Sequence, residues 1–199
     1  MAKINLTGNE LKSQREVMTR YTRYLPTLEL KKLQLELERR KLEAQLEAVR
    51  RQLAALGEKM SVWQQLFAEK LPRPVEQMVH LKQVISGEAN IAGLTVSVFN
   101  SVDIAVDEYD LVFTPPWIDA GIETIKEIIG CREWLKILEQ QREAILAELR
   151  RTTQRINLFK DRLIPECKEN IRQIRIHLGD MMAAAVGRAK IAKQKLQKK

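Results

Sequence analysis

The residues best suited to acid–base, metal or nucleophilic chemistry are few in this sequence and stand apart from one another. The two histidines, His80 and His177, do not belong to groups of ligands spaced as in a zinc site. The two cysteines, Cys131 and Cys167, form neither a disulfide framework nor a metal-binding pair. The phosphate-binding motifs G-x-x-x-x-G-K-S/T and G-x-G-x-x-G are absent. We therefore predict a non-catalytic protein without catalytic, cofactor-binding or metal-binding residues.

Charge is the second chemical feature of the chain, and it is unevenly distributed. The net charge is +8, from 34 Lys+Arg and 26 Asp+Glu. Residues 71–131 are acidic, with 3 basic and 9 acidic side chains, whereas both ends are basic. This division indicates that the middle and the ends meet different partners. In the helical stretches, acidic and basic residues alternate at i,i+4 spacing, which is typical of a solvated face.

The C-terminal end is the most basic part of the sequence. Six of its last twelve residues are Lys or Arg, among them Arg188, Lys190, Lys193 and Lys195. Two interpretations remain open for this end, an electrostatic surface for a partner and a solvated helix face. The tryptophans, Trp63, Trp117 and Trp134, are interpreted as packing residues rather than ligand sites.

The first element that must position these residues is a long helix within residues 1–71. Thr7 and Glu10 have the spacing of a capping box. From Leu11 the apolar residues follow a heptad frame, which predicts a coiled-coil seam. Pro26 lies inside the frame and is expected to kink the helix without ending it. The central seam residues are Leu42, Leu46, Val49, Leu53 and Leu56, and the same frame reaches Trp63 and Phe67.

Residues 72–115 have a different character, and we predict that they form a small foot region. The Pro-containing segment 71–74 ends the first helix. Residues 75–86 are expected to form a short helix. The β-branched and aromatic stretches 94–99 and 109–113 predict two short strands with residues 100–107 between them.

A second long helix is predicted within residues 116–199. Its seam residues are Leu138, Ile145, Leu149, Ile156, Phe159 and Leu163. The pattern shifts around Pro165 and resumes as a second stripe, which consists of Cys167, Ile171, Ile174, Leu178, Met182, Ala185, Ala189, Ala192 and Leu196. The predicted fold class is therefore mainly α, a long antiparallel two-helix coiled coil with a small central insertion that contains a β-hairpin. Both chain ends are expected at the same tip.

The segment 152–166, TTQRINLFKDRLIPE, resembles the C-terminal helix of the D subunit family of V-type (vacuolar/archaeal-type) ATPases. The residues that carry this resemblance are Arg155, Asn157 and Pro165. Residues 24–32 resemble the N-terminal helix of the family, and residues 187–193 resemble its basic end. The amino-acid sequences of these segments are similar to those of the bacterial branch found in chlamydiae and spirochaetes.

This resemblance implies the central rotor shaft of a rotary ATPase, which transmits torque between a catalytic hexamer and a membrane rotor. The implied partners are the catalytic and regulatory subunits, the F subunit of the stalk and the membrane-side rotor subunit of the C/d type. The basic residues Arg188, Lys190, Lys193 and Lys195 would face the hexamer. The shaft couples ATP hydrolysis or synthesis to H⁺ or Na⁺ transport. We expect a cytoplasmic protein, peripheral to the membrane through the complex and without direct membrane insertion.

Two other classes of function share the predicted architecture. A basic coiled coil could bind nucleic acid, but aromatic residues are not interleaved with Lys and Arg in the helices. A generic coiled-coil adaptor or chaperone arm is separated from a rotor shaft only by the motif around Arg155 and by its partners. No nucleic-acid partner is therefore predicted.

Overall fold

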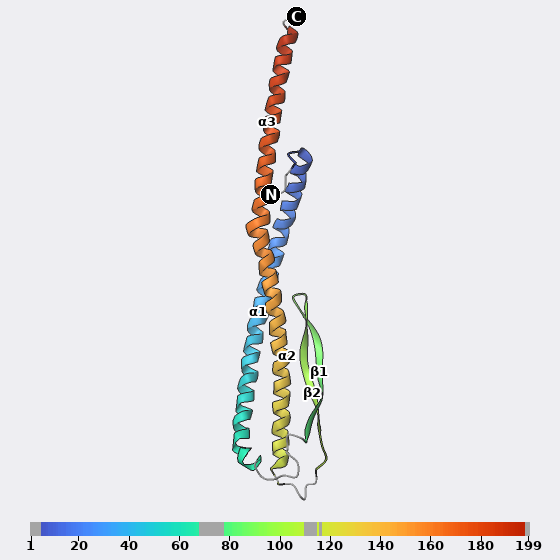
Figure 1. The fold of residues 1–199 in the computed structure, drawn as a ribbon, viewed down its shortest axis with the longest axis vertical. Helices are drawn as coiled ribbons and strands as arrows, with labels where there is room; N and C mark the ends of the chain where they lie inside the picture. Colours follow the sequence, from blue (N-terminus) through green and yellow to red (C-terminus); the bar gives the residue numbers. More distant parts are fainter. Residues whose placement is uncertain (1–4, 68–77, 110–114, 116, 198–199) are drawn as a thin grey trace. The chain divides into compact units, whose positions relative to one another are not determined.

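The computed structural model describes residues 5–67, 78–109, 115 and 117–197. In chain order the elements are helix α1 (Gly8–Phe67), strands β1 (Val79–Ile91) and β2 (Leu94–Val106), helix α2 (Ile118–Asn157), π-helix η2 (Leu158–Leu163) and helix α3 (Ile164–Gln197). The fold is mainly helical, as predicted, with one two-stranded antiparallel sheet (Figure 1). The chain divides into unit 1, Met1–Lys32 with Arg151–Lys199, and unit 2, Leu33–Arg150.

Helix α1 begins at the predicted cap. The Glu10 amide donates to Thr7 Oγ1 at 3.3 Å, and the Leu11 amide donates to the Thr7 carbonyl at 3.0 Å. The Glu10 carboxylate accepts a hydrogen bond from the Gln14 side chain at 2.8 Å instead of returning to Thr7. The cap satisfies amides that have no partner within the helix. As predicted, the helix continues through Pro26.

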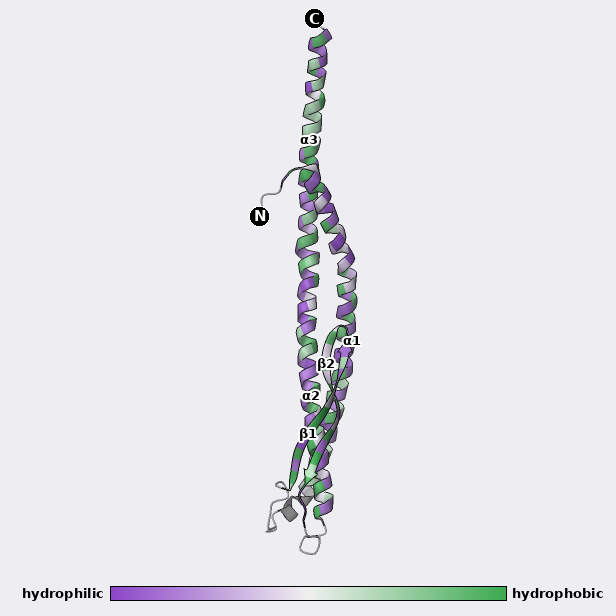
Figure 2. Cartoon of the chain, turned by 90° about the vertical axis from the view of Figure 1, so that its right-hand side faces the viewer, coloured by the Kyte–Doolittle hydropathy of each residue, from purple (hydrophilic) through white to green (hydrophobic). Residues whose placement is uncertain are grey.

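In unit 2, α1 and α2 lie side by side and run in opposite directions (Figure 1). Their facing side chains form one apolar cluster, which consists of Leu35, Leu42, Leu46, Val49, Leu56, Ile128, Cys131, Leu138 and Ile145. The most buried of these are Leu35, Val49 and Ile145, at 0–1% exposed. Apolar and polar residues are interleaved along both helices (Figure 2). A narrow apolar stripe on each helix therefore supplies the core of this unit.

The β-hairpin differs from the sequence prediction in its strands and in its turn. Strand β1 occupies 79–91, so the short helix predicted for 75–86 is wrong over its described residues. Strand β2 spans 94–106 and includes much of the predicted loop 100–107. Tyr109 lies outside both strands, and the rest of the predicted strand 109–113 lies outside the described residues.

The two-residue turn explains why the strands differ from those predicted. Ala92 and Gly93 connect the strands, and both have positive φ, 51° and 81°. Two positive φ values are typical of the turn that matches the twist of a two-residue hairpin. The turn is stabilised by the Gly93 amide, which donates to Asn90 Oδ1 at 2.9 Å. Ala-Gly lacks the Asn-Gly or Asp-Gly signature, and the register shifts between Leu81 and Gln83 and between Ile85 and Ser86 break the alternation of apolar residues in β1.

The hairpin packs on α2 through its base and along β2. At the base, Val79, Ile104 and Val106 contact a cluster formed by three isoleucines of α2, Ile118, Ile122 and Ile125. Further along, the rings of Phe99 and Trp134 stack with centroids 5.9 Å apart. The side chains of β1 are mostly exposed, including Leu81 and Ile85. Unit 2 is therefore a helix pair with a hairpin on its α2 side.

In unit 1, the first part of α1 packs against the end of α2, η2 and the beginning of α3. The rings of Tyr21 and Phe159 meet with centroids 5.0 Å apart. Both chain ends belong to this unit, and α3 continues past the start of α1 (Figure 1). All residues from 179 to 197 are exposed. The predicted stripe Met182, Ala185, Ala189, Ala192 and Leu196 therefore has no helix to pack against within the described chain.

Candidate functional site

The structure brings most of the predicted seam residues of unit 2 together. Leu42, Leu46, Val49, Leu56, Leu138 and Ile145 belong to the apolar cluster between α1 and α2, and Leu53 and Leu149 pack against it half-buried. The helices are also joined at the surface, where Arg50 Nη2 lies 3.0 Å from Glu139 Oε1. Because this ion pair is exposed, the apolar cluster supplies most of the attraction between the helices.

The side chain of Arg39 interrupts the seam between Leu35 and Leu42. Its Nη1 forms an ion pair with Glu43 Oε1 at 2.8 Å, one helical turn away. Its Nε is buried and has no hydrogen-bond partner among the described residues. The aliphatic part of such a side chain can cover apolar neighbours while its charged group reaches the surface. Arg39 is therefore accommodated at the edge of the seam.

Sequence reasoning missed the apolar face at the beginning of α2. Ile118, Ile122, Ile125 and Ile128 are buried there, against the hairpin base or the α1 seam. Their 3/4 spacing directly after the Pro-containing segment was a usable signal of an amphipathic helix. The predicted seam of the second helix began only at Leu138, so it did not include this face. Trp117 and Trp134 pack on these clusters, while the side chain of Trp63 lies outside the description.

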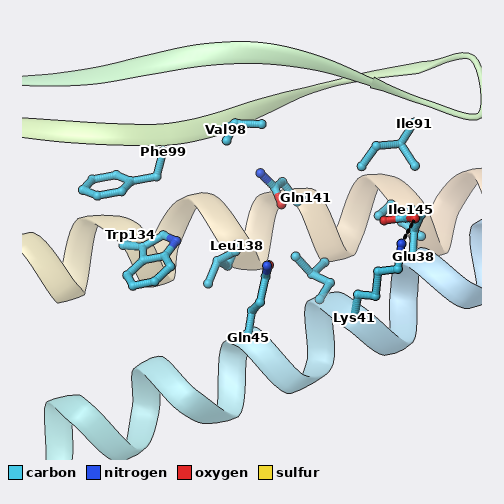
Figure 3. Close-up of a pocket in the computed structure, with 11 residues that line it drawn as sticks. Glu38, Lys41, Gln45, Ile91, Val98, Phe99, Trp134, Leu138, Gln141 and Ile145 are labelled. Carbon is cyan, nitrogen blue, oxygen red and sulfur yellow. Dashed lines mark hydrogen bonds and ion pairs between the residues drawn. The ribbon is translucent and has the colours of Figure 1, made fainter.

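A cavity of about 320 Å³ lies between the hairpin and the helix pair of unit 2. Gln141 is buried at its wall, and its amide donates a hydrogen bond to the carbonyl of Ser97 in β2. Trp134 and Phe99 border the same space, with Gln45 on α1 (Figure 3). The lining offers amide groups, aromatic faces and one ion pair, in which Lys41 Nζ lies 2.6 Å from Glu38 Oε1. Its chemistry is that of packing and hydrogen bonding.

The predicted residues of unit 1 lie within η2 and next to it. Ile156 is buried, and Phe159 and Leu163 are half-buried. The motif residues Arg155, Asn157 and Pro165 are exposed and do not contact one another in any hydrogen bond of the described chain. They flank the π-helix, with Asn157 directly before it and Pro165 as the second residue of α3. The motif therefore marks an irregular turn of the helix rather than a binding pocket.

The predicted basic residues lie on the unpartnered end of α3. Arg188, Lys190, Lys193 and Lys195 are all exposed. The same stretch also exposes five large apolar side chains, between 54% and 76% accessible, which are Met181, Met182, Val186, Ile191 and Leu196. Polar and apolar residues are mixed on this end of α3 (Figure 2). A helix that exposes this much apolar surface is typical of one that is covered by a partner.

Two buried thiols and one surface carboxylate have shifted pKa values. Burial raises the pKa of Cys131 and Cys167, and the nearby Glu127 and Glu166 add to the respective shifts. Hydrogen bonds from Arg172, and then from Gln173, lower the pKa of Glu169 to about 2. Both Arg172 bonds measure 2.8 Å. These shifts follow from packing and from one helix-surface network, and they do not form a catalytic pair.

Other sites of chemistry are not found in the part of the chain that the structure describes. No group of three or more His, Cys, Asp or Glu side chains could hold a metal ion there. Among the described helices, none is both long and apolar enough to cross a membrane. The candidate functional site is therefore a set of surfaces, the seam, η2 and the exposed end of α3.

The described elements, a helix pair with a packed hairpin and an exposed, partly apolar helix end, define a mainly helical protein that presents surfaces to partners. The chain belongs to the family of ATP synthase D subunits, whose model matches residues 10–194.

Individual relatives share the similarity along their whole length. The V-type ATP synthase D subunit of Borreliella burgdorferi is 44% identical over 199 residues, which cover 100% of this chain and 98% of that protein. The V-type ATP synthase D subunit of Chlamydia muridarum is 32% identical over 200 residues, with 98% and 97% covered. That of Chlamydia trachomatis serovar L2 is 31% identical with the same coverage. The resemblance to the bacterial branch of this family is thereby confirmed.

Proposed function

We propose that this chain is the central rotor shaft, the D subunit, of a V-type ATPase or ATP synthase. It transmits torque between the catalytic hexamer and the membrane rotor, and so couples ATP hydrolysis or synthesis to H⁺ or Na⁺ transport. The observation that carries this proposal is the full-length similarity to V-type ATP synthase D subunits. The shaft itself is non-catalytic, because the mechanical role needs stiffness and surfaces rather than reactive groups.

The seam supports a mechanical role through its packing. A torque-bearing pair of helices must not slide or twist apart, and interdigitated side chains in a dense core resist both movements. In unit 2 the pair is packed along α1 from Leu35 to Leu56 and along α2 from Ile128 to Ile145. We propose that the seam residues named above have this stiffening role.

The exposed surfaces support a division of partners along the chain. The α3 end, with its basic and apolar side chains, would lie inside the ring of catalytic and regulatory subunits. The foot region 72–115, between the helical regions 1–71 and 116–199, would hold the F subunit of the stalk and the membrane-side rotor subunit of the C/d type. The protein would then be cytoplasmic and peripheral to the membrane through these partners.

An affinity purification from detergent-solubilised native membranes tests this proposal. The tagged full-length chain should co-purify with the catalytic and regulatory subunits in a complex that hydrolyses ATP. A matched variant with Met182, Val186 and Ile191 replaced by Asp should keep the stalk partner but lose the hexamer. A preparation that contains no ATPase subunits would refute the rotor assignment.

A further inference from the structure

The continuous helical stretch α2–η2–α3 contains one residue more than regular heptad spacing of its seam side chains would use. In unit 1 the seam side chains before η2 are Thr152 and Ile156, followed by Phe159 and Leu163, at steps of 4, 3 and 4. Continued at this spacing, the seam would use positions 166, 170, 173 and 177. The buried residues are instead Cys167, Ile171 and Ile174, each one position later, and Leu178 follows half-buried. We call this extra position the surplus residue.

The opposite helix has no matching irregularity. Along the same unit α1 keeps its 3/4 spacing, and its half-buried seam side chains are Leu11, Gln14, Met18, Tyr21, Leu25 and Leu28. An uninterrupted heptad stripe on one helix therefore faces a stripe with an insertion on the other. A single insertion in a regular helix would turn the following residues by about 100° away from the seam.

The π-helix accommodates the surplus residue without this rotation. A π turn closes its hydrogen bonds between residues five apart and so takes up one more residue than an α turn. The Ile164 amide donates to the Phe159 carbonyl in this way. The segment contains no buried residue, and Leu158 is 45% exposed. The surplus residue therefore lies on the exposed side of the helix, while the seam continues on the side that faces α1.

Pro165 provides a second reason for the π turn. Proline has no amide hydrogen, and within an α-helix its ring collides with the carbonyl four residues earlier, here that of Asp161. Pro165 directly follows Ile164, whose amide closes the π turn, so its missing amide falls where the regular hydrogen-bond pattern is already interrupted. The seam spacing and Pro165 therefore both hold the turn in its irregular state.

We propose that η2 and Pro165 form a yielding point, at which α3 can turn about its own axis without opening the seam. Partial tightening of the π turn toward α geometry would rotate the start of α3. Complete tightening is opposed, because it would bring Glu166, Asn170 and Gln173 into the seam in place of Cys167, Ile171 and Ile174. The rotation is therefore limited and reversible. This role rests on the proposed rotor function, in which the helices carry a twisting load.

The surplus residue can be tested by a deletion, because Leu163 is followed by Ile164, a second apolar residue that can replace it in the seam. If Asp161 is deleted, Ile164 takes the seam position of Leu163, and Cys167, Ile171 and Ile174 return to regular heptad spacing. Asp161 is exposed, so its own contacts are dispensable. The change is made together with Pro165→Ala, which restores the missing amide donor. The reference is the single variant Pro165→Ala. The matched control is Pro165→Ala with one alanine inserted after position 161.

The first measurement uses the isolated full-length chain and is independent of the rotor assignment. The deletion should raise the melting temperature above that of Pro165→Ala by roughly 2–4 °C, whereas the alanine insertion should lower it. Amide hydrogen exchange in residues 158–166 should be faster than in both flanking stretches, and the deletion should remove that difference. If deletion and insertion lower the melting temperature alike, no surplus residue is stored at η2 and the proposal fails.

The second measurement uses the complex assembled with its partner subunits. The deletion variant should assemble as well as the reference but show a several-fold loss of coupled ATP turnover, because its α3 can no longer yield. Turnover equal to that of the reference would overturn the yielding role while leaving the rotor function intact. If the wild-type chain itself does not assemble, the rotor function is wrong, and the exchange and melting results still decide whether η2 stores a residue.

Discussion

At the scale of single residues, the seam can be tested by graded truncation. Ile145 is 1% exposed in the unit 2 cluster, and Leu53 packs against the same cluster but is only half-buried. Ile145→Ala should lower the free energy of unfolding by about 2–5 kcal/mol, and Leu53→Ala by less. Leu37, 50% exposed on α1, is the control and should change stability by under about 0.5 kcal/mol. Urea denaturation that gives equal losses for all three would show that the seam is assigned wrongly.

The carboxylate of Glu169 provides a pH-dependent prediction. Its pKa is about 2 in the folded protein, against an ordinary value of 4.5, because Arg172 and Gln173 donate hydrogen bonds to it. Its small stabilising effect should therefore be complete above pH 4.5 and disappear as the pH falls toward 2. In Arg172→Ala, an NMR titration of this carboxyl should give a pKa closer to 4.5. An unchanged pKa in that variant would contradict the assigned cause.

Individual seam residues were predictable because one physical rule governs them. Period and apolarity identified Leu42, Leu46, Val49 and Ile145, since a helix pair buries the stripe that repeats. The buried polar residues Gln141 and Thr152 were not predictable in this way. Gln141 is buried because the Ser97 carbonyl of the hairpin accepts its amide hydrogen, and that neighbour is 44 residues away in the sequence.

At the scale of elements, alanine substitutions at two glycines can test for backbone strain without a steric clash. A side chain on Gly93 would meet no atom within 4 Å, but the backbone φ is 81°. Gly93→Ala should therefore destabilise the hairpin by about 1 kcal/mol through backbone strain alone. Gly57→Ala, in α1 and equally unhindered, should stabilise the helix by about 0.5–1 kcal/mol. The effects are measured by hydrogen exchange in each element, and a stabilising Gly93→Ala would disprove the strained turn.

The elements were predictable to different degrees. Helix α1 followed from its long heptad frame and from the Thr7 cap, both of which are local signals. The hairpin strands were misplaced because Ala92-Gly93 gives a weak turn signal, and because the two register shifts break the alternation of apolar residues in β1. The shift near Pro165 was visible in the sequence, but its explanation by a π turn required the backbone hydrogen bond from Ile164 to Phe159.

At the scale of the whole molecule, the exposed end of α3 is expected to contribute to assembly with partners but not to the stability of the fold. Removal of residues 188–199 should leave the melting temperature unchanged, because every described residue of this segment is exposed. Assembly with the catalytic hexamer should weaken, most clearly at high ionic strength, where salt screens the charges that remain. Sedimentation of reconstituted complexes over a range of salt concentrations measures this. Full-strength assembly of the truncated chain at every salt concentration would identify the end as a solubilising tail.

The central claim is that this chain turns relative to the catalytic subunits, and a reversible cross-link tests it most directly. A cysteine at Ala192, on the exposed end of α3, is paired with one on the facing surface of the catalytic hexamer. Oxidation should stop ATP hydrolysis, and reduction should restore it. The matched control joins the foot region to the F subunit of the stalk, which would rotate with the shaft, and should leave turnover unchanged. Undiminished hydrolysis in the complex cross-linked at position 192 would contradict the rotor function.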